Sequence, residues 1–171
     1  MELVAIIPEF NLYEEFWKIY TKGDTIPPQY ISEDAIVEKS LISEGAEIYG
    51  EVYNSVISPN VVIGKGSVIR NSIIMSNTVI GENCTIDKAI IAEDVVIGNN
   101  VHIGIGEEAE NVFKPKVYGF GIATIGEKSV VPDNVQIGKN TAISGVTEPA
   151  DYPEGILTGG GVIMKEDGEE A

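Results

Sequence analysis

The chain has 171 residues, 43% of them hydrophobic, which is enough for one domain with a sizeable core. Its formal net charge of −16 excludes nucleic acid and anionic membrane surfaces as partners, because both would repel it. We expect neither a membrane span nor a signal peptide, and the single cysteine excludes internal disulfides and indicates a cytoplasmic protein.

Residues 1–30 precede the repeat described below and are expected to form a lead-in to it. Asn11 is a suitable N-cap for a short helical turn over Leu12–Tyr20, because its side chain can accept from a free backbone N–H. Five aromatic residues fall within eleven positions: Phe10, Tyr13, Phe16, Trp17 and Tyr20. We expect this aromatic cluster to be a plug that covers the first coil or an adjacent domain.

A short repeat dominates the rest of the chain. The steps Ile63-Gly64, Ile80-Gly81 and Ile97-Gly98 are 17 residues apart. A second series, one small residue followed by two aliphatic residues, recurs at spacings of 15, 17 and 17, beginning at Ser40, Ser55, Ser72 and Ala89. Each step of this series is closed by a residue type that favours turns: Gly45, Asn60, Asn77 and Asp94. Self-similarity at a short fixed period predicts a solenoid.

Division of one period into thirds predicts three short strands per coil. A strict six-residue rule places these side chains inside: Ile63, Ile69, Met75, Ile80, Ile86, Ala92, Ile97 and Ile103. Smaller residues four places after the Ile-Gly step are expected to fill a corner: Ser67, Cys84, Val101, Ser129 and Thr141. The sequence therefore predicts an all-β protein, a single-stranded parallel β-helix with about six coils between Ile31 and Ile143.

The repeat is lost between Gly104 and Thr124. The intervening residues, about 105–123, contain Pro115 and several glycines, which predicts a loop ejected from one corner of the coil. Loops on solenoids commonly carry binding functions, so binding is expected there rather than on the coils.

The C-terminal region predicts a cap for the solenoid. Ile156–Met164 reads as two short strands around the turn Gly159–Gly161, and these strands can pair with the last coil and cover its open edge. The glycines lack the Lys-Ser/Thr ending and the following helix of a phosphate-binding loop. We therefore interpret residues 31–171 as one β-helix with a C-terminal strand cap.

The sequence offers little catalytic chemistry. His102, the single histidine, lies between Val101 and Ile103, which point inward in the repeat, so its ring is expected to point outward. One histidine excludes a three-histidine zinc site within the chain. Cys84 occupies an inward position and is expected to be a small buried side chain rather than a nucleophile. We expect no catalytic residue and no metal site.

The lead-in carries the most specific motifs of the chain. These are Pro8-Glu9-Phe10-Asn11-Leu12-Tyr13, Trp17-Lys18-Ile19-Tyr20-Thr21 and Pro27-Pro28, followed by the first coils. Together they resemble the junction in glucose-1-phosphate adenylyltransferases (ADP-glucose pyrophosphorylases), where a catalytic domain is followed by a left-handed β-helix. The resemblance covers roughly Met1 to Gly104. It implies a left-handed coil, and it implies that residues 1–30 link the β-helix to a catalytic domain outside this sequence.

The resemblance also implies a function. The whole enzyme would make ADP-glucose and pyrophosphate from ATP and glucose 1-phosphate for glycogen biosynthesis, with ATP and Mg²⁺ bound in the catalytic domain. This chain would be its non-catalytic oligomerisation and regulatory domain, with that catalytic domain and further copies as partners, tetrameric in relatives. Some relatives bind an anionic effector through arginines and lysines. This chain has one arginine, so the candidates for a regulatory anion site are Lys114, Lys116 and Lys139.

Two alternatives stay open at this point. The chain could be a stand-alone hexapeptide acyltransferase with His102 as general base, because that chemistry also occurs on this repeat. It could also be the C-terminal domain of the non-catalytic subunit that pairs with the active adenylyltransferase in some bacteria.

Overall fold

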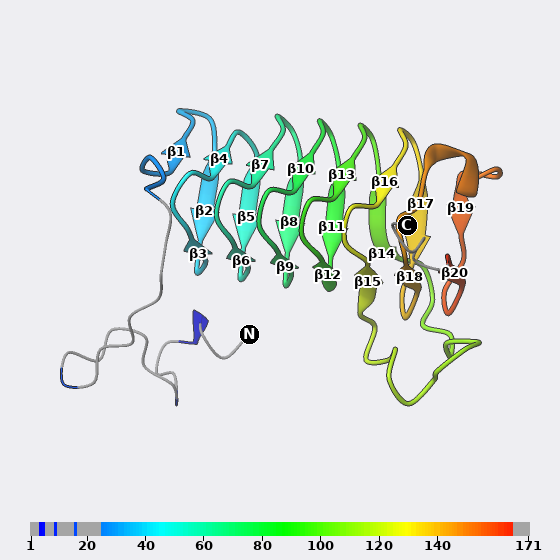
Figure 1. Ribbon diagram of the computed structural model, residues 1–171. Coiled ribbons are helices and arrows are strands. Elements are labelled where there is room, and N and C mark those ends of the chain that lie inside the picture. Colours follow the sequence, from blue (N-terminus) through cyan, green and yellow to red (C-terminus); the bar gives the residue numbers. More distant parts are fainter. Residues whose placement is uncertain (1–3, 6–8, 10–15, 17–24, 166–171) are drawn as a thin grey trace.

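The computed structural model describes residues 4, 5, 9, 16 and 25–165, and its strands wind into a parallel β-helix (Figure 1). The expected cap at Asn11 and most of the aromatic cluster lie outside these residues. Across the described residues, no helix is both long and apolar enough to cross a membrane. The division at residue 30 between a lead-in and the β-helix, and the left-handed sense of the coil, stay predictions.

The strands form three parallel sheets, one on each side of the coil. Sheet A contains β1 (Tyr30–Ile31), β4 (Glu47–Ile48), β7 (Val62–Ile63), β10 (Val79–Ile80), β13 (Val96–Ile97) and β16 (Val130–Val131). Sheet B contains β2 (Ile36–Glu38), β5 (Glu51–Tyr53), β8 (Val68–Arg70), β11 (Thr85–Asp87), β14 (His102–Ile105), β17 (Gln136–Gly138) and β19 (Ile156–Leu157). Sheet C contains β3 (Leu41–Ile42), β6 (Val56–Ile57), β9 (Ile73–Ile74), β12 (Ala89–Ile91), β15 (Ala123–Ile125), β18 (Ala142–Ser144) and β20 (Val162–Met164).

Equivalent residues of successive coils lie side by side. Ile63, Ile80 and Ile97 pair in register in sheet A, which confirms that the 17-residue spacing in the sequence is one turn of the solenoid. The fold class predicted from the repeat, an all-β parallel β-helix, is confirmed. Figure 1 shows sheet A along the top of the view and sheet C along the bottom.

A column of isoleucines fills the interior. Adjacent residues of a strand point to opposite sides, so each short strand places one side chain inside the coil and one outside. The fully buried isoleucines are Ile48, Ile57, Ile63, Ile69, Ile74, Ile80, Ile86, Ile91, Ile97, Ile103 and Ile137. Burial of each such side chain is worth about 1.5–3 kcal/mol, so this column is the main source of stability.

The strict six-residue rule is wrong at the corner between sheets B and C. The interior residue after Ile69 is Ile74, five positions on, and Met75 is only half-buried. One coil later Ile91 is buried in place of the expected Ala92. Asn71, with φ of 50°, turns the chain two residues after Ile69, whereas Asn77 turns it three residues after Ile74, so this corner uses one residue fewer.

Residues with positive φ also turn the chain at the corner between sheets C and A. The four predicted turn residues Gly45, Asn60, Asn77 and Asp94 have φ between 57° and 71°. The side chains of the last three form a ladder, in which Asn60 Nδ2 donates to Asn77 Oδ1 at 3.2 Å and Asn77 Nδ2 donates to Asp94 Oδ1 at 3.0 Å. The predicted corner fillers are all buried, as expected: Ser67, Cys84, Val101, Ser129 and Thr141.

The C-terminal strands close the last coil, as the sequence predicts. β19 pairs with β17 and β20 pairs with β18, so both extend their sheets by one strand. The last strand of sheet A, β16, bonds to an irregular segment rather than to a further strand. The N–H of Val130 donates to the carbonyl of Thr147 at 2.9 Å, and a 3-10 helix, η2 (Pro149–Asp151), follows.

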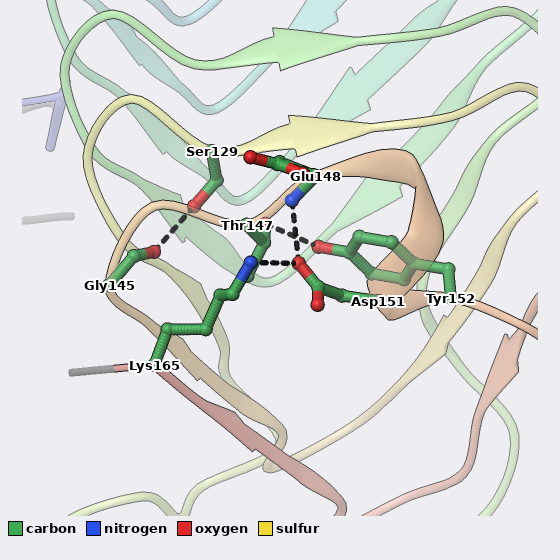
Figure 2. A network of polar contacts seen from close by, with 7 residues as sticks. All are labelled: Ser129, Gly145, Thr147, Glu148, Asp151, Tyr152 and Lys165. Carbon is green, nitrogen blue, oxygen red and sulfur yellow. Dashed lines mark hydrogen bonds and ion pairs between the residues drawn. The ribbon is translucent and has the colours of Figure 1, made fainter. Parts of the chain in front are cut away.

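A polar network holds this cap together (Figure 2). Asp151 Oδ2 accepts from the backbone N–H of Glu148 at 2.7 Å and from Lys165 Nζ at 2.9 Å. These two bonds lower the pKa of Asp151, the backbone bond more than the lysine. The buried hydroxyls of Thr147 and Tyr152 lie 2.9 Å apart, and burial raises the pKa of Tyr152.

Candidate functional site

The candidate site is the ejected loop, residues 106–122, together with the coil against which it folds. The chain leaves β14 after Ile105 and returns at Ala123 in β15. The pairing of β14 with β17 shifts register between Ile103 and Ile105, which marks the exit point. Gly104 at the exit has φ of 82°, and a Cβ there would collide with the carbonyl of Asp87, so only glycine fits.

Asn140, in the corner after β17, anchors both ends of the loop. Its side chain is buried, with 4% of its surface exposed. Its Nδ2 donates to the carbonyl of Ala109 at 2.8 Å, and its Oδ1 accepts from the N–H of Gly121 at 2.7 Å. One amide therefore fixes the outgoing and the returning arm of the loop at the same point.

Asn111 supplies a second buried anchor. Its Nδ2 donates to the carbonyl of Asn140 at 2.8 Å. Its Oδ1 accepts from the N–H groups of Phe113 and Lys114, at 3.0 and 2.9 Å. The local turn that follows is thereby tied to the last coil, and buried hydrogen bonds of this kind are costly to leave unmade.

The glycine-rich turn of the C-terminal cap completes the platform. Gly160 donates its N–H to the carbonyl of Lys139 at 2.8 Å and accepts from the N–H of Val112 at 3.0 Å. Its φ is 74°, and a Cβ would collide with the carbonyl of Glu110 in the loop. This run of glycines therefore serves close packing against the loop.

Two cavities flank the loop. One, of about 360 Å³, is apolar and lies between the loop base and the cap, lined by Ile105, Ala109, Gln136, Ile156, Leu157 and Gly159 among others. The other, also about 360 Å³, is lined by Glu108, Glu110, Lys116, Tyr118, Phe120 and Asn140 among others.

The three lysines proposed for an anion site occupy different surroundings. Lys116 lines the second cavity beside two glutamates, whose negative charge opposes anion binding. Lys114 Nζ lies 4.9 Å from the centre of the Phe113 ring. Lys139 is half-buried in the corner between β17 and Asn140. The described residues thus do not bring the three ammonium groups together around one cavity, and the anion site stays a prediction.

The other chemically reactive side chains lie on or in the coils. His102 is half-buried on the outer face of sheet B between Thr85 and Gln136, while Val101 and Ile103 are buried, as predicted. Cys84 is fully buried, its Sγ lies 3.1 Å from the carbonyl oxygen of Gly98, and burial raises its pKa. In the described part of the chain, no group of three or more His, Cys, Asp or Glu side chains could hold a metal ion.

Sequence reasoning missed the two buried asparagines that define the site. Asn140 stands at a corner like many other asparagines here, and its sequence context gives no sign of its burial. The available signal is its position, about one coil after the interruption.

Comparison with known proteins places this architecture in a family. Residues 28–125, more than half of the chain, match the family model described as GlmU-like, C-terminal hexapeptide. The chain belongs to this hexapeptide-repeat family. Glucose-1-phosphate adenylyltransferase from Lachnospira eligens is 67% identical over 165 residues, covering 96% of this chain and 39% of the relative. The corresponding protein of Thermosipho melanesiensis is 64% identical over 126 residues, covering 74% of this chain and 31% of the relative.

This hexapeptide-family chain therefore spans less than two fifths of the length of these relatives. Among solved structures, the acetyltransferase domain of PglB from Neisseria gonorrhoeae matches with a TM-score of 0.46 and 16% identity, over 83% of this chain and 52% of that one. The resemblance to adenylyltransferases that the sequence motifs indicated is confirmed.

Proposed function

We propose that this chain is the non-catalytic β-helical part of a glucose-1-phosphate adenylyltransferase. The whole enzyme would make ADP-glucose and pyrophosphate from ATP and glucose 1-phosphate in the cytoplasm, for glycogen biosynthesis. The observation that carries this proposal is the 67% identity to such an enzyme over nearly all of this chain but only 39% of the relative. ATP and Mg²⁺ would bind in the part of the enzyme that this chain does not match.

The outer surface of sheet C supports a role beside another domain. In its seven strands no residue is charged, whereas sheet B carries Glu38, Glu51, Arg70 and Asp87. The outward side chains include Leu41, Val56, Ile73 and Ile90, all half-buried. In a chain of net charge −16, an uncharged aliphatic face is typical of a surface that another domain covers. We assign it to the catalytic domain.

Enzyme assays test the assignment. The protein translated from the whole gene should release pyrophosphate from ATP and glucose 1-phosphate and form ADP-glucose, and the 171-residue chain should not. ADP-glucose formation by this chain alone would overturn the non-catalytic role. Absence of activity in the whole protein would instead point to the non-catalytic homologous subunit.

The acyltransferase alternative makes a different prediction. A general base is usually oriented by a partner group, and within the described residues nothing accepts a hydrogen bond from the His102 ring. Acetyl transfer from acetyl-CoA that is lost in His102→Ala would favour that alternative over the adenylyltransferase assignment.

The regulatory part of the proposal concerns a small anionic effector at the ejected loop. Lys114 and Lys116 are exposed there, and Lys139 lies in the adjoining corner. Calorimetric titration with fructose 1,6-bisphosphate and with inorganic phosphate should give heat that is lost in a Lys114→Ala/Lys116→Ala double variant. No heat, or heat unchanged in that variant, would refute this site.

A further inference from the structure

The ejected loop presents large apolar side chains to solvent. Val112, Phe113, Val117 and Phe120 are 80%, 54%, 65% and 84% exposed. The buried side chains of Asn111 and Asn140 hold the backbone beneath them, so these residues are fixed in place. Exposed aromatic side chains on a rigid support are typical anchors of a protein interface.

Charge is unevenly divided along the ejected loop. Its outgoing arm carries Glu107, Glu108 and Glu110, whereas residues 112–122, which hold all four exposed apolar side chains, contain Lys114 and Lys116 and no acidic residue. The Lys114 ammonium lies over the Phe113 ring, so positive charge and aromatic surface occur together. The complementary partner is an apolar surface bordered by carboxylates.

This same chain carries such a surface on sheet A, which we call the valine stripe. Val62, Val79, Val96 and Val130 pair in register along the outer face, and Val79 and Val96 are 40% and 43% exposed. The corners on either side of these strands carry more exposed acidic than basic residues: the acidic residues are Glu82, Glu93, Asp94, Glu127 and Asp133, and the basic residues are Lys65 and Lys128.

The loop and the valine stripe of one molecule cannot meet. Figure 1 shows the loop projecting below sheet C, on the side of the β-helix opposite β10, β13 and β16. We propose that the ejected loop of one copy docks on the valine stripe of a second copy. The inference rests on the oligomerising role within the proposed function and names the surfaces that would perform it. Because the two surfaces differ, two copies can exchange the contact reciprocally about a two-fold axis, or the contact can run head to tail and form a ring or an open filament.

Self-association of the purified chain tests the docking. Sedimentation equilibrium should show oligomers for the unaltered chain and about tenfold or more weaker association for Phe113→Ser/Phe120→Ser. These side chains are exposed, so the double variant should keep its circular dichroism spectrum and melting temperature. Ile156→Ser is the matched control, because it removes a 58% exposed side chain on sheet B, outside both surfaces, and it should associate normally.

Cross-linking identifies the receptor surface. Phe120→Cys in one preparation and Val79→Cys in another should form a mixed disulfide on gentle oxidation. Ile36→Cys, at 42% exposure on sheet B, should not react with Phe120→Cys. The native Cys84 is buried and should not interfere.

The outcomes distinguish failure of the docking proposal from failure of the oligomerising role on which it rests. Oligomers that persist unchanged in Phe113→Ser/Phe120→Ser, or equal cross-linking at the two receptor positions, would overturn the docking and leave the oligomerising role intact. A chain that stays monomeric at high concentration would overturn both. The enzyme assignment is decided independently by ADP-glucose formation.

Discussion

Asn140→Ala is the most informative single substitution in this molecule. It removes the two hydrogen bonds that hold the loop arms, to Ala109 and Gly121. The N–H of Gly121 is then buried without a partner, which costs about 1–3 kcal/mol, and the bond to the more exposed Ala109 carbonyl adds about 0.5–1.5 kcal/mol. Alanine at the native φ of 57° costs about 1 kcal/mol more. The expected loss in free energy of unfolding is therefore about 2.5–5.5 kcal/mol.

Asn134→Ala is the matched control. Asn134 also adopts left-handed backbone, with φ of 64°, but it is exposed and no other described residue bonds its side chain. Asn134→Ala should therefore lower the free energy of unfolding by only about 1 kcal/mol, the cost of placing alanine at a positive φ. Asn140→Gly isolates the cost of the lost side-chain hydrogen bonds, because glycine adopts the native φ without strain and still lacks the amide.

Urea denaturation followed by circular dichroism measures these differences, and amide hydrogen exchange at Gly121 reports the loop directly. Exchange of that N–H should accelerate in Asn140→Ala and Asn140→Gly, and stay slow in Asn134→Ala. Equal destabilisation by Asn140→Ala and Asn134→Ala, with unchanged exchange at Gly121, would refute the role of Asn140 as an anchor.

Three further outcomes follow from the coil and its cap. Ile74→Ala should cost about 2–5 kcal/mol by leaving an internal cavity, and Met75→Ala clearly less; equal losses in urea unfolding would contradict the five-residue step. The pKa of Asp151 is lower in the folded state, so its stabilising contribution is complete above the unfolded pKa and is lost as pH falls through the folded one. The melting-temperature difference between the native chain and Asp151→Asn should therefore shrink in acid, and a constant difference would count against this linkage. Gly160→Ala should destabilise the chain more than Gly155→Ala in urea unfolding, because only the former Cβ meets loop backbone while both residues have positive φ; similar losses would show that the loop moves away freely.

The coils were predictable because their determinants repeat. Ile63 and Ile80 differ by one period, and whatever places one inside the coil places the other there too. The choice between Ile74 and Met75 was not accessible, since both are apolar and adjacent. Which of them points inward depends on how many residues the preceding corner uses, and that number is set by the backbone of Asn71.

In the candidate site, the existence of the loop could be predicted from the sequence, but the residues that anchor it could not. A lost repeat and Pro115 indicate a loop from composition alone. The roles of Asn111 and Asn140 depend on contacts between residues 29 positions apart in the sequence. Asn140 and Asn134 share residue type and backbone conformation, and Asn140 alone is buried because both arms of the ejected loop bond to it.

The proposed function assigns the outer face of sheet C to the catalytic domain, and one pair of substitutions tests that assignment. Thr85 and Ile90 are both half-buried outward residues in the middle of the stack, on β11 of sheet B and β12 of sheet C. Lysine at either position can extend its ammonium into water in the isolated chain, so Thr85→Lys and Ile90→Lys should lower its melting temperature by similar, small amounts. In the whole protein, the proposed function places the catalytic domain over sheet C, so Ile90→Lys would put an unpaired charge beneath it, which costs several kcal/mol, whereas Thr85→Lys would stay in water. Thermal unfolding and ADP-glucose formation of the whole enzyme should therefore suffer in Ile90→Lys alone. Equal behaviour of the two variants there would mean that sheet C is not the covered face.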